Sequence, residues 1–138
     1  MARPCYKQSV TQPLRRRLTL LALALLTVAL GLALRLIPIG LPAFAVQYGG
    51  SILWAAMVYL LFAAAMPRGS RKSTALIACL FAAIVELSRL HHTPAFDAFR
   101  LTLTGKLLLG RVFNLWHFPI YWVTISLTAG LDRKSGSK

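Results

Sequence analysis

Acidic residues are scarce in this 138-residue chain. Only three residues are Asp or Glu, against sixteen Lys and Arg, which gives a formal net charge of +13. Charged residues of both signs make up 14% of the chain, whereas an average soluble domain has about 25%. Because apolar residues make up 57%, this shortage of charge argues against a water-exposed globular surface and favours a membrane protein.

Cysteine and histidine, which form disulfides and metal sites, are also scarce. Cys5 lies in a basic N-terminal segment and Cys79 inside an apolar run, so we predict no disulfide between them. His91 and His92 are adjacent and would point in different directions on a helix. The sequence contains no H-x-x-x-H, H-E-x-x-H or G-x-S-x-G pattern, so we predict no metal, no cofactor and no catalytic residue.

The basic residues lie between apolar runs and do not form one polar domain. Nucleic-acid binding needs a contiguous basic face, so we predict no nucleic-acid partner. By the positive-inside rule, clusters of this kind mark cytoplasmic segments. Five precede Leu18, three separate two apolar runs and three follow Leu131: Arg3, Lys7, Arg15, Arg16 and Arg17; Arg68, Arg71 and Lys72; and Arg133, Lys134 and Lys138.

Four apolar runs are long enough to cross a bilayer as helices. The first contains no charge from Leu18 to Leu34, and a helix of that length rises about 25 Å. We predict an all-α, multi-pass transmembrane bundle of about four spans, at about 18–36, 50–66, 73–90 and 112–131.

An even number of spans places both termini on one side of the membrane, and the basic clusters place that side in the cytoplasm. We therefore predict a basic cytoplasmic arm over 1–17, a single transmembrane domain over 18–131 and a basic cytoplasmic tail over 132–138. The expected location is the bacterial inner membrane.

Two external segments connect the predicted spans. In the first, Pro38, Pro42 and the Gly49–Gly50 pair are expected to break regular structure. In the second, apolar residues of 95–111 recur at helical spacing, which predicts a short interfacial or re-entrant helix. The alternative is that this segment begins a longer, tilted last span.

A predicted polar cluster lies near the external end of the third span. An unpaired Glu86 would cost about 3 kcal/mol toward the centre of a membrane helix and less near the interface. Arg89 is three residues further on, on the same helix face, while Arg35 and Arg100 should lie at the same depth. We expect Glu86 to pair with one of these arginines and so to hold the spans together.

The alternative is that the same cluster binds an anionic headgroup or another substrate. Neighbouring polar residues are secondary candidates for interfacial or interhelical hydrogen bonds: His91, His92, Asp97 and His117.

Several motifs occur in a fixed order along the chain. After the arginine that follows the first span come YGGSILWAAMVY, ELSRL, FDAFR and LLLGRVFNLWHFPIY. From about Leu18 to Leu127 this order resembles the bacterial membrane family known as domain-of-unknown-function 2809. The Glu-x-x-Gln and following Asp of that family's pattern also resemble VanZ-like proteins, which are linked to glycopeptide resistance.

The chain departs from the family's pattern at three polar positions. Ser51 and His117 stand where the pattern has Asp, and Arg89 stands where it has Gln, whereas Glu86 is kept. The resemblance therefore implies that Glu86 no longer shares its site with two aspartates and is neutralised by Arg89. This change suggests an accessory role.

Two classes of function fit the sequence. The first is a non-enzymatic accessory or scaffold subunit that packs against a larger membrane protein complex, because no catalytic constellation is present. The second is a VanZ-like protein, enzymatic or not, that binds or processes a lipid or envelope precursor at the external headgroup level. Membrane lipids are partners in both interpretations.

Overall fold

The computed structural model describes residues 8–38, 40–109 and 113–135. These residues form six helices and no strand, which confirms the all-α prediction. The helices are α1 (Gln8–Leu36), α2 (Ala43–Ala65), α3 (Arg71–Ser88), α4 (Pro94–Leu101), α5 (Leu103–Leu108) and α6 (His117–Ser135).

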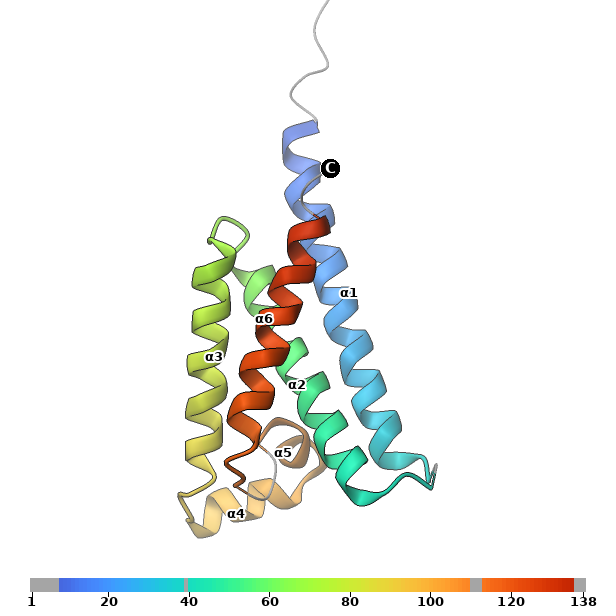
Figure 1. The fold of residues 1–138 in the computed structure, drawn as a ribbon, viewed down its shortest axis with the longest axis vertical. Helices are drawn as coiled ribbons and strands as arrows, with labels where there is room; N and C mark the ends of the chain where they lie inside the picture. The colour runs from blue at the N-terminus through green and yellow to red at the C-terminus, as the bar shows by residue number, and fades with distance from the viewer. Residues whose placement is uncertain (1–7, 39, 110–112, 136–138) are drawn as a thin grey trace, which may run out of the picture.

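The four long helices lie side by side, and the two short ones lie across one end of them (Figure 1). α2 occupies the middle and packs against α1, α3 and α6, while α3 also packs against α6. The beginning of α1, the α2–α3 connection and the end of α6 all lie at the opposite end from α4 and α5 (Figure 1).

Small and aromatic side chains fill the interior of the bundle. Ala55, Ala78 and Ala82 are completely buried and allow the helix backbones to approach closely, as small residues do in membrane helix pairs. Tyr59 and Ile125 fill the larger spaces between the helices and are equally buried.

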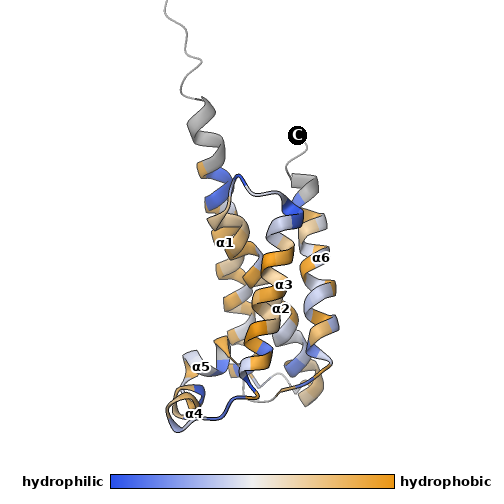
Figure 2. Ribbon diagram, turned by 90° about the vertical axis from the view of Figure 1, so that its left-hand side faces the viewer, coloured by the Kyte–Doolittle hydropathy of each residue, from blue (hydrophilic) through white to orange (hydrophobic). Residues whose placement is uncertain are grey.

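Large apolar side chains lie on the outside instead. Each long helix exposes some of them midway along its length, for example Leu25 (70% exposed), Ile52 (46%), Leu80 (56%) and Leu127 (64%). Apolar residues cover the shaft of the bundle, and hydrophilic residues gather toward its two ends (Figure 2). Soluble monomers rarely expose such a contiguous apolar surface.

Two helices of the described part are long and apolar enough to cross a membrane by length and composition. These candidate spans are Leu14–Leu36 and Ala43–Ala65. α3 is 18 residues long but contains three charged residues, Arg71, Lys72 and Glu86, which lie in its first and last turns.

The prediction that the Gly49–Gly50 pair breaks regular structure is wrong. α2 begins at Ala43, after Pro42, and runs through both glycines, so it is longer than the predicted span 50–66. A glycine inside a helix costs about 1 kcal/mol relative to alanine. Packing offsets this cost, because Gly50 is buried and a Cβ at Gly49 would contact Leu34 Cδ1 at 3.5 Å.

Two short helices, α4 and α5, lie between α3 and α6, so residues 95–109 do not extend the last long helix. Thr102 lies between them, and its hydroxyl accepts a hydrogen bond from the Gly105 N–H at 3.1 Å. A Cβ at Gly105 would lie 2.0 Å from the carbonyl oxygen of Phe99, so only glycine fits this close turn. Leu107 belongs to α5, and residues 110–112 lie outside the described residues.

The two predicted basic segments are partly helical. α1 already begins at Gln8, within the predicted arm, and α6 continues to Ser135, within the predicted tail. At its other end α6 begins at His117, five residues later than the predicted start of the last span at 112.

Candidate functional site

Glu86 lies in the last turn of α3, and its side chain is completely buried. The expected ion pair with Arg89 is present, since Arg89 NH1 lies 2.7 Å from Glu86 Oε2. Arg89 follows at the i+3 position, which places both side chains on one face of the chain as the helix ends. Arg89 is itself only 7% exposed.

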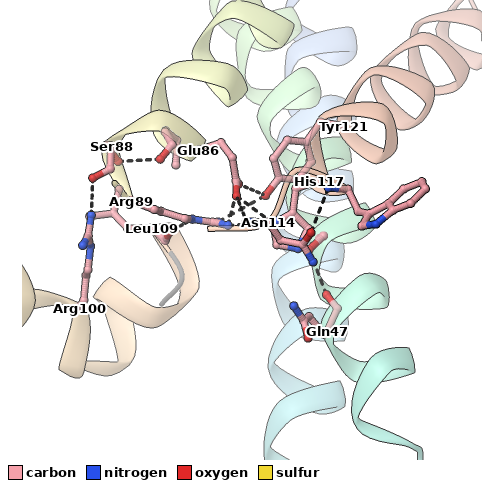
Figure 3. Close-up of polar contacts among 12 residues, drawn as sticks. Gln47, Glu86, Ser88, Arg89, Arg100, Leu109, Asn114, His117 and Tyr121 are labelled. Atoms are coloured by element: carbon pink, nitrogen blue, oxygen red, sulfur yellow. Dashed lines mark hydrogen bonds and ion pairs between the residues drawn. The ribbon is translucent and has the colours of Figure 1, made fainter. Parts of the chain in front are cut away.

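The other partners of Glu86 come from α6 and the segment before it (Figure 3). The Tyr121 hydroxyl donates to Glu86 Oε2 at 3.1 Å, and the Asn114 N–H donates to Oε1 at 3.0 Å. His117 Nδ1 lies 3.1 Å from the same Oε1. We call Glu86, Arg89, His117 and Tyr121 the Glu86 cluster.

His117 has two competing neighbours at one ring nitrogen. Its Nδ1 lies 3.0 Å from Arg89 NH1, which can only donate, and 3.1 Å from the Glu86 carboxylate, which accepts. The carboxylate favours the tautomer in which Nδ1 carries the proton and donates to Glu86. His117 Nε2 is buried and has no hydrogen-bond partner within the described part of the chain.

Arg89 connects this cluster to the end of α5. Its Nε donates to the carbonyl of Leu109, and its NH2 donates to the Tyr121 hydroxyl at 3.4 Å. The Glu86 cluster therefore joins α3, the end of α5 and α6 through hydrogen bonds between buried groups. Such a network stabilises one arrangement of helices, and removal of one partner leaves a buried charge uncompensated.

Arg100 does not join Glu86, although the sequence suggested that it would lie nearby. Its NH2 donates to the carbonyl of Ser88 at 2.6 Å, and NH1 donates to the carbonyl of His91 at 3.3 Å. The side chain is only 4% exposed and pairs with Asp97 at 3.3 Å. Arg100 therefore binds the carbonyls at the end of α3, where a cation is favoured.

Arg35 also remains separate from Glu86. It lies in the last turn of α1, and its NH1 donates to the carbonyl of Lys106 in α5 at 2.9 Å. Of the secondary candidates, His91 is exposed, and His92 makes a 3.4 Å contact with Asp97. The structure thus brings only Glu86 and Arg89 of the predicted polar cluster together, with His117 added from α6.

Two adjoining apolar cavities lie beside this polar end. The α1–α2 cavity, of about 190 Å³, lies between α1, α2 and α5 and is lined in part by Arg35. The larger cavity, of about 460 Å³, lies between α2 and the α3–α5 segment. Trp54, Met57 and Leu108 line both cavities.

A second polar contact, at the opposite end of the bundle, was missed by the sequence analysis. Asp132 Oδ2 accepts a hydrogen bond from Arg16 NH2 at 2.9 Å and another from the Tyr59 hydroxyl at 3.1 Å. The sequence feature that could have indicated this contact is Asp132 itself, the single acid in an otherwise basic tail. Because its side chain is only 8% exposed, Asp132 joins α1, α2 and α6 inside the bundle.

Within 8–38, 40–109 and 113–135, no three residues of the types His, Cys, Asp and Glu gather in a way that could hold a metal ion. Cys79 is a free thiol in α3. The Glu86 cluster contains one carboxylate and one imidazole, both bound to neighbouring groups, and its geometry is that of a packed polar core.

Fold and site together define a class: an all-α bundle with an apolar exterior, two helices among the described residues that are long and apolar enough to be candidate membrane spans, and a buried polar cluster at one end. A family model described as "Protein of unknown function (DUF2809)" matches residues 40–125, which is more than half of the chain. The chain therefore belongs to the DUF2809 family. No solved structure matches it.

Two of the three positions at which the chain departs from the family's expected pattern contact Glu86. These are Arg89 and His117, whereas the Ser51 hydroxyl donates to the carbonyl of Gln47, one turn earlier in α2, at 3.0 Å. The neutralisation of Glu86 by Arg89, which the resemblance implied, therefore has a direct geometric basis.

Proposed function

We propose that this chain is a four-span protein of the plasma membrane, with both termini in the cytoplasm, that acts as a non-enzymatic accessory subunit of a larger membrane complex. The observation that carries the proposal is the distribution of apolar side chains between the surface and the interior. Each of the four long helices exposes large apolar side chains midway along its length, while small residues lie inside.

Helix length and charge placement support α3 and α6 as additional spans. They contain 18 and 19 residues, which corresponds to about 27–29 Å of helix against a hydrocarbon core of about 30 Å. Arg71 and Lys72 lie in the first turn of α3, at interfacial depth, and Glu86 is paired in the last turn. The beginning of α1 and the α2–α3 connection, which carry basic clusters, lie at the end we assign to the cytoplasm (Figure 1).

Reporter fusions test this topology. A periplasm-active reporter is expected to be silent after Gly69 and Lys138 and active after Gly40 and His92. If only α1 and α2 crossed the membrane, the fusion after His92 would be silent, and the four-span proposal would be wrong.

The Glu86 cluster supports an architectural role better than a catalytic one. Both Glu86 and Arg89 are buried, and the carboxylate already has four neighbours from Arg89, His117, Tyr121 and the Asn114 backbone. An external precursor would have to displace these internal partners. The alternative function, recognition of a precursor by the Glu86–Arg89 pair, is therefore not supported by this geometry.

Photo-crosslinking in native membranes tests the accessory role. A photoreactive residue at Ile84, which is 64% exposed on α3, is expected to give one discrete protein adduct. The matched control is the same residue at Ala82, which is completely buried on the same helix. If positions on all four helices, such as Leu25, Leu61 and Leu127, gave lipid adducts only, the accessory role would be refuted.

A further inference from the structure

Arg35 is a cation without a carboxylate partner. The chain contains only three acids, and each of them pairs with another basic residue: Glu86 with Arg89, Asp97 with Arg100 and Asp132 with Arg16. Within the part of the chain that the structure describes, Arg35 forms no ion pair, and its NH1 donates to a backbone carbonyl. It differs in this respect from the three arginines named above.

The α1–α2 cavity begins at this arginine. Arg35 lines the cavity and is exposed, so the cavity reaches the surface where the charge lies. Its remaining wall is almost entirely apolar and includes Val28, Gly31 and Trp54. An apolar cavity of this kind does not hold water well, because water needs polar partners.

We infer that this cavity holds an acyl chain of one anionic phospholipid and that the phosphate of this lipid pairs with Arg35. A planar guanidinium matches the geometry of a phosphate and can bind two of its oxygens at once. The adjoining larger cavity shares Trp54, Met57 and Leu108 in its wall, so a second apolar space lies directly beside the first. The inference rests on the proposed membrane location, which places α1 and α2 within the bilayer.

Charge distribution selects the headgroup class. A zwitterionic lipid carries an ammonium group that gains from a nearby carboxylate, but all three acids are engaged elsewhere. Lys106, whose carbonyl accepts the hydrogen bond from Arg35, adds a second positive residue to this end of the bundle. A headgroup with a net negative charge is therefore preferred to a zwitterionic one of equal chain length.

Two glycines provide a matched pair of variants. Gly31 lines the α1–α2 cavity, and a Cβ there would meet nothing within 4 Å. Gly130 in α6 also has open space around its Cβ position, but it is exposed and does not line either cavity. Gly31→Leu fills the cavity and removes no contact, and Gly130→Leu controls for the change from glycine to leucine in a helix.

The experiment is native mass spectrometry of the purified full-length protein with phosphatidylglycerol and phosphatidylethanolamine of identical acyl chains. The wild type is expected to bind one phosphatidylglycerol at least about tenfold more tightly than phosphatidylethanolamine, because the ammonium group of phosphatidylethanolamine offsets the charge of its phosphate and finds no free carboxylate here. Arg35→Gln should abolish this preference, and Arg35→Lys should retain part of it. Gly31→Leu should weaken both lipids, and Gly130→Leu should weaken neither.

Equal preference in the wild type and in Arg35→Gln would overturn the inference, and so would equal binding by the two leucine variants. Thermal unfolding of each variant verifies that it is folded. If Arg35→Gln does not fold, the comparison of Gly31→Leu with Gly130→Leu still decides the test. The reporter fusions report separately on topology, so a correct four-span topology without lipid preference would reject the lipid site alone.

Discussion

Replacement of Glu86 by glutamine should destabilise the bundle far more than a similar change at the surface. Glu86→Gln keeps the shape of the side chain but removes the charge that Arg89 NH1 contacts at 2.7 Å. Arg89 would then be a cation, 7% exposed, without its counter-ion. Breaking a buried ion pair from one side costs about 3–5 kcal/mol, which is a large part of a total stability of about 5–15 kcal/mol.

The matched control is Asp97→Asn, because Asp97 and Arg100 are also an i,i+3 pair at the same end of the bundle. The side chain of Asp97 is 48% exposed and that of Arg100 only 5%, so water screens this pair from the side of the carboxylate, and Asp97→Asn should cost about 1 kcal/mol. Arg100 also keeps its hydrogen bonds to the carbonyls of Ser88 and His91 in that variant.

Unfolding of the purified protein in a mild detergent, followed by tryptophan fluorescence, gives the free-energy differences. The double variant Glu86→Gln, Arg89→Met should recover part of the loss, since it removes both buried charges. If Glu86→Gln changed stability no more than Asp97→Asn, the reasoning that the Glu86 cluster holds α3 to α6 would be refuted.

Three further changes test other parts of the bundle by the same unfolding assay. Gly105→Ala should destabilise by more than about 3 kcal/mol, because its Cβ would overlap a backbone carbonyl at 2.0 Å, whereas Gly130→Ala should be neutral or stabilise by up to about 1 kcal/mol. Asp132→Asn should cost about 1–3 kcal/mol through the lost ion pair with Arg16, and this loss should not depend on salt as strongly as a surface pair does. Ser70→Ala should cost about 1 kcal/mol, because the Ser70 side chain caps α3. If the free energy of unfolding of one of these variants were unchanged, the contact at that position would be contradicted.

The helical class could be predicted from the sequence because it depends on local patterns. Long apolar runs located all four long helices, and the i,i+3 spacing made Arg89 one of three candidate partners of Glu86. The boundaries of α2 could not be predicted in this way, because packing against α1 overrides the low helix propensity of Gly49 and Gly50.

The remaining contacts of the site depend on packing between distant segments. His117 and Tyr121 are 31 and 35 residues from Glu86, so their contacts follow from the way α6 lies against α3. The path of α4 likewise decides that Arg100 binds the carbonyl of Ser88 and not Glu86. These contacts required the structure, because no local pattern specifies which helix faces which.

Arg35 and Arg89 show why residue type and depth alone do not assign a role. Each was expected as a candidate partner of Glu86, yet Arg89 is buried in an ion pair, whereas Arg35 is exposed at the edge of an apolar cavity and donates a hydrogen bond to a backbone carbonyl. Since Glu86 is already neutralised by Arg89, a second arginine there would leave an excess positive charge in a buried site. Arg89 therefore neutralises Glu86, whereas Arg35 remains an exposed cation, which is the charge that the proposed lipid site uses.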